Sequence, residues 1–143
     1  MCSIAQLEMV RLPALRLIFA SATMRPMART VLIVDDHPSF RASARAMLES
    51  EGFDVVGEAE DGASAIDAVA TLRPEVLVLD VQLPDMTGFD VCDALQLSGT
   101  LPDIILVSSR DGSDYGELVA RSCACGFVPK DELSGDLVSA LLP

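Results

Sequence analysis

The chain has 143 residues and a formal net charge of −12 at pH 7, and 50% of its residues are hydrophobic. This length is typical of one domain that buries a hydrophobic core and does not need disulfides or metals to stabilise it. Residues 30–143 contain 21 of the 22 acidic residues but only 6 of the 10 basic ones. Because so acidic a body repels phosphate backbones and anionic lipid headgroups, we expect this chain to bind neither nucleic acid nor membranes directly.

The first 26 residues differ in composition from the rest of the chain. An acidic residue precedes their apolar segment and Arg16 interrupts it, which disfavours a secretory signal peptide. The apolar run is also shorter than the roughly 20 residues that span a bilayer. We favour a third interpretation, in which translation begins at Met24 or Met27. Residues 1–26 are then a disordered or loosely packed extension of a domain that covers residues 27–143.

From residue 30 onward, short apolar runs alternate with segments of helical period. Strands are predicted at residues 31–34, 54–58, 76–79, 104–107 and 127–128. Helical stripes follow them over residues 40–48, 66–70, 91–95, 115–122 and 133–141. Gly52 is a favourable residue just beyond the end of the first helix, and Thr87 can cap the start of the third. The chain therefore reads as five successive strand–helix units.

Apolar strands that alternate with helices favour a parallel sheet buried on both faces. Right-handed crossovers point all the strands the same way, so their carboxyl ends share one edge. A polar or charged residue follows four of the predicted strands: Asp35 and Asp36, Asp80, Ser108 and Lys130. Because ligands of such sheets bind beyond the carboxyl ends of the strands, we expect a functional site at this edge.

Three carboxylates at one edge of a sheet need a cation among them, and hard oxygen ligands suit Mg²⁺. We expect Asp35 and Asp36 to hold the metal, with Asp80 facing it as a nucleophile. A carboxylate in that position can attack a phosphoryl group and form an aspartyl phosphate. The Lys130 ammonium and the Ser108 hydroxyl would neutralise and hydrogen-bond the phosphoryl oxygens.

The segment from about residue 30 to residue 141 resembles the receiver domains of two-component response regulators. The motifs that carry the resemblance are VDDHP, LDVQLPDMTGFD, VSS and GFVPKD. The runs DDHPSFR and KDELSGDLVSAL are most similar to the subgroup whose members usually carry a helix-turn-helix DNA-binding output domain. The resemblance implies an α/β, flavodoxin-like (βα)5 fold, doubly wound, with a five-stranded parallel sheet in the order 2-1-3-4-5.

The resemblance also implies a role for each acidic residue at the strand ends. Asp80 matches the phosphoacceptor, Asp36 a direct ligand of Mg²⁺, and Asp35 the acid that holds metal-bound water. The backbone carbonyl of Gln82 matches the third protein ligand, so the implied metal site consists of these four residues.

Other positions match the catalytic and switching groups of the family. Ser108 matches the hydroxyl that moves toward the phosphoryl group, and Lys130 matches the cation. Phe127 matches an aromatic whose rotamer is coupled to the hydroxyl, although a plain core aromatic explains it equally well. His37, the one histidine of the chain, is interpreted as a loop residue rather than a phosphate carrier. Pro129 lacks an amide donor, which favours an edge strand for its segment.

The resemblance further implies a cytoplasmic signalling protein that receives its phosphoryl group from a sensor histidine kinase or a phosphotransfer protein. It implies a phosphoacceptor that catalyses its own phosphorylation and slow dephosphorylation, not an enzyme acting on other substrates. Output would pass to an effector or a second copy through the fourth helix, fifth strand and fifth helix. Because no output module follows residue 143, we expect either a stand-alone receiver or the receiver half of a longer regulator.

Two alternatives from other functional classes stay open. A phosphorylation-independent, receiver-like adaptor would keep the fold and lose the site, whereas every site position is filled here. A Mg-dependent aspartyl-phosphate phosphatase of the haloacid-dehalogenase type needs a second acid two residues after the nucleophile, where this chain has Gln82.

Overall fold

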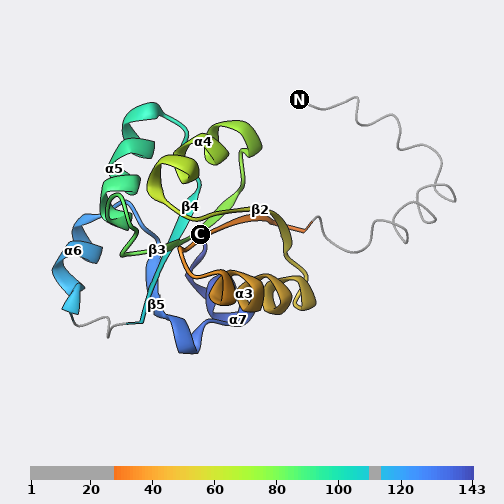
Figure 1. Cartoon of the computed structure of the whole chain (residues 1–143). Helices are drawn as coiled ribbons and strands as arrows, with labels where there is room; N and C mark the ends of the chain where they lie inside the picture. Colours follow the sequence, from red (N-terminus) through yellow and green to blue (C-terminus); the bar gives the residue numbers. More distant parts are fainter. Residues whose placement is uncertain (1–27, 110–113) are drawn as a thin grey trace, which may run out of the picture.

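The computed structural model of the protein describes residues 28–109 and 114–143. The predicted extension over residues 1–26 lies outside these described residues and stays a prediction. Within them, parallel strands form one sheet with the order β2-β1-β3-β4-β5, which confirms the order implied by the family resemblance (Figure 1). The strands are β1 (Thr30–Val34), β2 (Asp54–Ala59), β3 (Val76–Asp80), β4 (Asp103–Ser108) and β5 (Gly126–Pro129).

Helices cover both faces of this sheet. They are α3 (Pro38–Ser50), α4 (Gly62–Leu72), α5 (Gly88–Ser98), α6 (Gly116–Arg121) and α7 (Gly135–Leu141), with a short 3-10 helix η3 (Lys130–Glu132) before α7. In Figure 1, α3 and α7 lie on one face, and α4 and α5 on the other. Across residues 28–109 and 114–143, no helix combines the length and the apolar character that crossing a membrane requires.

Local signals explain where several helices begin and end. Capping boxes start α4, through Asp61 and Ser64, and α5, through Thr87 and Asp90. Gly52 adopts a φ of 98° just after the end of α3, a conformation in which glycine carries no steric penalty. The predicted roles of Thr87 and Gly52 are therefore confirmed.

The last predicted helix differs from the observed one. The apolar stripe predicted one helix starting at about Leu133, but the chain forms η3 and then α7. Leu133 has extended backbone angles, and the Ser134 side chain accepts a hydrogen bond from the amide of Leu137. A serine in this position caps a new helix, so the helix begins after Ser134.

Alternate residues of the central strands enter two separate cores. On β1, Val31 and Ile33 pack in one core with residues of α3 and α7, whereas Leu32 and Val34 pack in the other with residues of α4 and α5. Every residue of β3 is buried. Each fully buried leucine or isoleucine side chain contributes roughly 1.5–3 kcal/mol, so the strand ends rest on a rigid framework.

The two edge strands depart from the apolar pattern of the central ones. At one edge, β5 ends at Pro129, as expected for a residue without an amide donor. At the other edge, β2 carries the charged residues Asp54 and Glu58, both of which lie within the predicted strand at residues 54–58. Because β2 pairs only with β1, its outer edge is free of strand partners within the described residues. Glu58 of β2 reaches Arg41 and Arg45 of α3, which packs against this strand.

Candidate functional site

Three polar side chains lie together at the carboxyl ends of β1, β3 and β4, along the C-terminal end of the sheet. Asp35 follows β1, Asp80 ends β3, and Ser108 ends β4. Among the described residues, these are the buried polar or charged ones, with exposed fractions of 0%, 3% and 2%. Burying charge is costly without a compensating partner, so this edge is chemically distinct from the apolar cores.

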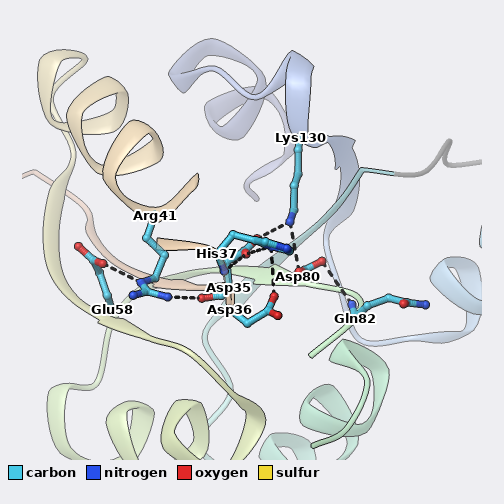
Figure 2. Close-up of polar contacts among 8 residues, drawn as sticks. All are labelled: Asp35, Asp36, His37, Arg41, Glu58, Asp80, Gln82 and Lys130. Carbon is cyan, nitrogen blue, oxygen red and sulfur yellow. Dashed lines mark hydrogen bonds and ion pairs between the residues drawn. The ribbon is translucent and has the colours of Figure 1, made fainter. Parts of the chain in front are cut away.

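The carboxylate of Asp35 is held at both oxygens (Figure 2). Its Oδ1 accepts a hydrogen bond of 2.8 Å from the backbone amide of His37 and lies 2.9 Å from Nδ1 of the same residue. Its Oδ2 lies 2.6 Å from Nζ of Lys130, yet no described donor meets it with hydrogen-bond geometry. The contact with Lys130 is therefore a charge interaction that leaves an oxygen lone pair of Asp35 available.

Lys130 joins the two buried acids. Its Nζ lies 3.2 Å from Oδ2 of Asp80, in addition to the contact with Asp35, and 4.9 Å from the centre of the Phe40 ring. The other oxygen of Asp80 accepts a hydrogen bond of 3.3 Å from the backbone amide of Gln82. Figure 2 shows Lys130 extending from its own segment toward both carboxylates.

These contacts shift two pKa values in the same direction. Burial raises the pKa of the Asp80 carboxyl, and the charge of Asp35 raises it further, against the opposing effect of Lys130. Burial by itself lowers the pKa of Lys130, but the close contact with the Asp35 carboxylate and the charge of Asp80 outweigh that effect and raise it. Lys130 therefore stays cationic, while Asp80 is a carboxylate held under electrostatic stress.

Asp36 and His37 complete the cluster on its exposed side. The side chain of Asp36 is 36% exposed, and its Oδ1 lies 3.2 Å from Nδ1 of His37. One potential ligand atom each from Asp35, Asp36, His37 and Asp80 lies within 4.8 Å of the others. The arrangement is an acidic cluster with one imidazole at its rim.

The loop after Asp80 is anchored to a neighbouring helix. The carboxylate of Asp85 accepts hydrogen bonds from the first amides of α4, at 2.8 Å from Gly62 and 3.0 Å from Ala63. At the start of α5, a Cβ added to Gly88 would lie 2.6 Å from the carbonyl oxygen of Asp80. Glycine is thus required for the chain to pass this close to the site.

A cavity of about 280 Å³ opens over the cluster. It is lined by Asp36, His37, Asp80, Gln82, Leu83, Pro84, Ser108, Ser109 and Lys130. A small anionic group such as a phosphoryl group fits a cavity of this size and would meet the ammonium of Lys130.

The structure therefore brings together six of the seven predicted site residues. Lys130 contacts Asp35 and Asp80 directly, and a carboxylate oxygen of Asp36 lies within 4.8 Å of oxygens of these two acids. Gln82 and Ser108 line the cavity. Their individual roles stay predictions. Phe127 lies apart, on β5, where its ring centre is 6.1 Å from that of Tyr115. It packs against the core beneath α4 and α5 and does not line the cavity.

The sequence interpretation missed two residues near the site, Phe40 and Arg41, and the contacts of a third, His37. His37 lies in a loop, as predicted, but it also contacts both neighbouring acids. Phe40 lies under the ammonium of Lys130, and Arg41 donates to the backbone of Asp35. Their position in the sequence could have indicated this, because the first turn of a helix that directly follows the acidic pair must lie beside that pair.

Comparison with known proteins agrees with this geometry. The family model described as the response regulator receiver domain matches residues 31–142. The DNA-binding transcriptional activator EvgA of Escherichia coli is 33% identical over 110 residues, which make up 77% of this chain and 54% of EvgA. The transcription regulator BvgA of Bordetella pertussis is 32% identical over 114 residues, covering 80% of this chain and 54% of BvgA. The chain thus spans about half the length of these relatives.

Solved structures of response regulators are also similar to this chain. The signal receiver domain of a Mycobacterium tuberculosis response regulator designated NarL superposes with a TM-score of 0.72 at 32% identity, covering 81% of this chain and 94% of that one. A LuxR-family two-component response regulator from Aurantimonas superposes with a TM-score of 0.70 at 28% identity, covering 80% of this chain and 82% of that one.

Proposed function

Because this chain belongs to the family of response regulator receiver domains, we propose that Asp80 accepts a phosphoryl group from a sensor histidine kinase or a phosphotransfer protein in a Mg-dependent reaction. The observation that carries the proposal is the position of Lys130 between the two buried acids, where its Nζ lies 2.6 Å from Asp35 and 3.2 Å from Asp80. A buried carboxylate beside a fixed cation is suited to phosphoryl transfer, which depends mainly on positioning and charge neutralisation.

The chemistry needs one bond to form and one to break. An ionised oxygen of Asp80 forms a bond to phosphorus while the bond between phosphorus and the donor's imidazole nitrogen breaks. The nitrogen keeps the electron pair and takes up a proton. Lys130 stays protonated and offsets charge on the phosphoryl oxygens, and the Ser108 hydroxyl, buried at the end of β4, is suited to hydrogen-bond one of them.

The donor atoms of the acidic cluster fit Mg²⁺. Carboxylate oxygens of Asp35, Asp36 and Asp80 gather within 4.8 Å, and the buried Oδ2 of Asp35 accepts no hydrogen bond from the described residues. These three side chains, with the backbone carbonyl of Gln82, would hold the ion. When bound, Mg²⁺ supplies positive charge that offsets the repulsion among the acids and the incoming phosphoryl group.

Intact-protein mass spectrometry after incubation with Mg²⁺ and acetyl phosphate tests the phosphoacceptor. The wild-type chain should gain one phosphoryl group, and Asp80→Asn should gain none because an amide is not a nucleophile of this kind. Asp93→Asn removes an exposed acid of α5 and should label like the wild type. An adduct that persists in Asp80→Asn, or no adduct on the wild type with donor in excess, contradicts the assignment. The second result favours the phosphorylation-independent adaptor.

Thermal unfolding with and without Mg²⁺ tests the metal site. Binding to the folded state should stabilise the protein by roughly 2.7 kcal/mol when the free ion is at a hundred times its dissociation constant. Asp36→Ala removes a ligand from the exposed side of the cluster and should largely abolish this gain. Equal stabilisation of the wild type and of Asp36→Ala would place the ion elsewhere.

The proposed output is contact with other proteins through α6, β5 and α7. Lys130 directly follows β5, and the apolar residues Leu118 of α6 and Leu137 of α7 are 49% and 38% exposed. A displacement of Lys130 can therefore be transmitted through β5, which contains Phe127, to this partly apolar surface. A second copy or an effector is the proposed partner, in a cytoplasmic signalling role without direct contact of this chain to nucleic acid or membrane.

NMR shifts after addition of Mg²⁺ and a beryllofluoride phosphoryl mimic test this output. Shifts should extend from the cavity into α6, β5 and α7, and cross-linking should detect a second copy or an effector on that surface. Shifts confined to the loops around Asp80 would contradict the relay.

A further inference from the structure

The backbone of Asp35 is held as firmly as its side chain. The amide of Asp35 donates to the carbonyl of Ala59 at 3.0 Å, and its carbonyl accepts a hydrogen bond of 2.6 Å from Nη1 of Arg41. Arg41 lies in the first turns of α3, so its side chain reaches back over the acidic turn (Figure 2). Both polar backbone groups of Asp35 are thus fixed by other elements of the fold.

The guanidinium of Arg41 is itself oriented by an acid on the edge strand. Its Nε donates to Oε1 of Glu58 on β2 at 2.9 Å. The second oxygen of Glu58 accepts a bond of 2.8 Å from Nε of Arg45, one helical turn later. The Arg41 side chain is 16% exposed, so it is largely packed within the protein. A planar guanidinium fork that is held at one end delivers its remaining donors in a fixed direction.

This geometry controls the peptide between Asp35 and Asp36. Its carbonyl oxygen is the atom that Arg41 holds, and rotation of the peptide would change the direction in which both carboxylates leave the backbone. Arg41 does not itself line the site cavity described above. Its contact with the site passes through the backbone of Asp35.

We propose that Arg41 is a positioning residue of the metal site, which holds the peptide after Asp35 so that the two adjacent carboxylates face the cation. Glu58 orients the guanidinium of Arg41 for this task. The inference rests on the proposed function, because it concerns affinity of the same acidic cluster for Mg²⁺.

The charge of Arg41 and its positioning role have opposite effects on metal affinity. A guanidinium close to a cation site repels the cation, so removing the charge alone would strengthen Mg²⁺ binding. Removing the hydrogen bond to Asp35 would loosen the acidic turn and weaken binding. The sign of the change therefore distinguishes positioning from electrostatics.

Mg²⁺ titration of the folded chain, followed by backbone amide NMR, measures this sign. Arg41→Gln should weaken Mg²⁺ binding by about tenfold, the lower end of the range for residues that orient metal ligands. Arg41→Lys keeps the charge but cannot reproduce the fork, so it should also weaken binding. Arg45→Gln is the matched control, because Arg45 shares Glu58 but does not contact Asp35. Its affinity should stay within about twofold of wild type, as for a partly exposed ion pair.

Several outcomes overturn the inference. Tighter binding, or unchanged binding, in Arg41→Gln means that the guanidinium acts only as a charge or not at all. An equal loss in Arg45→Gln means that the ion pairs with Glu58 act only through general stability. Absence of Mg²⁺ binding by the wild-type chain overturns the proposed metal site, and the inference with it.

A second variant covers the case in which Arg41→Gln does not fold. Glu58→Gln leaves the guanidinium in place but weakens its orientation, and it should reduce Mg²⁺ affinity by about threefold, less than loss of the donor itself. Glu60→Gln removes the same charge two residues away and is the control for long-range attraction of the cation. Equal affinities for Glu58→Gln and Glu60→Gln overturn the positioning role.

Discussion

Two charged networks of this protein lie side by side. Folding raises the pKa of an acid in the first network and lowers the pKa of an acid in the second. In the cluster at the strand ends, Asp35 and Asp80 share one cation, Lys130. In the bridge between α3 and β2, Arg41 and Arg45 share one anion, Glu58. The first network has an excess of acid, whereas the second is balanced, because Arg45 also pairs with Glu49 at 3.2 Å.

The two networks also differ in how deeply their acids are buried. Asp80 is almost fully buried, and desolvation followed by the charge of Asp35 raises its pKa. The side chain of Glu58 is 28% exposed, and hydrogen bonds from Arg45 and then Arg41 lower its pKa despite some desolvation. The cluster therefore stores electrostatic stress that a further cation relieves, whereas the bridge is already compensated. A binding site and a structural support are thus distinguished by charge balance and burial.

The largest effect on stability should come from removing the one cation of the cluster. Lys130→Met leaves Asp35 and Asp80 buried without their ion-pair partner. We expect a loss of about 2–3 kcal/mol in unfolding free energy at neutral pH, somewhat below the range for fully buried pairs. Chemical denaturation measures it, and Mg²⁺ should restore part of the loss.

The control for this prediction is an exposed basic residue. Arg121→Met breaks an ion pair with Glu117 in which the two side chains are 67% and 83% exposed. It should cost less than about 0.5 kcal/mol, as is usual for solvent-exposed pairs. Similar losses for Lys130→Met and Arg121→Met would contradict a stabilising role of Lys130 beyond that of an exposed ion pair.

Removing an acid from the cluster should have the opposite sign. Because the folded-state pKa of Asp80 is raised, its ionised form costs the folded protein free energy above that pKa. Asp80→Asn should therefore raise the unfolding free energy at neutral pH by roughly 1 kcal/mol, as when a stressed functional site is relieved. The gain should shrink as the pH falls toward the usual Asp value of 3.8, where the wild-type carboxyl becomes protonated. Urea titrations at several pH values measure this slope, and a gain that is independent of pH would contradict the assignment.

Removing the acid of the bridge should destabilise the protein instead. The pKa of Glu58 is lowered in the folded state, so its contribution is complete above the usual Glu value of 4.5 and is lost as the pH falls through the folded-state pKa. Glu58→Gln should cost about 0.5 kcal/mol at neutral pH, a value reduced by solvent screening. The difference from wild type should vanish under acid conditions. If the stability loss caused by Glu58→Gln increased as the pH fell, the ionised Glu58 carboxylate would not be stabilising the folded protein.

The smallest effect should follow deletion of residues 1–26. Their composition predicts an extension that adds little to the domain, so neither charged network should change. The melting temperature of the truncated chain should stay within about 2 °C of the full chain, since 1 kcal/mol corresponds to roughly 4 °C in a domain of this size. A fall of several degrees would show that the segment packs on the core.

Much of the candidate site was predictable because it depends on where strands end. Asp35, Asp80 and Ser108 were placed at one edge by the parallel direction of the strands alone, and the structure brings them there. The contact between Arg41 and Asp35 was not predictable in this way. Helical periodicity indicates which face of α3 is apolar, but not which backbone atom a long polar side chain reaches.

The sequence by itself determined the order of the strands and helices, the apolar residues on them, and the polar residues at the strand ends, because these follow from local periodicity and chain direction. The tertiary structure decided which atoms meet. Lys130 reaches Asp80 from 50 residues away, and its Nζ is shared with Asp35. Glu58 is shared by two arginines because β2 packs beside α3. Such contacts depend on side-chain direction and on the packing of distant elements, which no local pattern encodes.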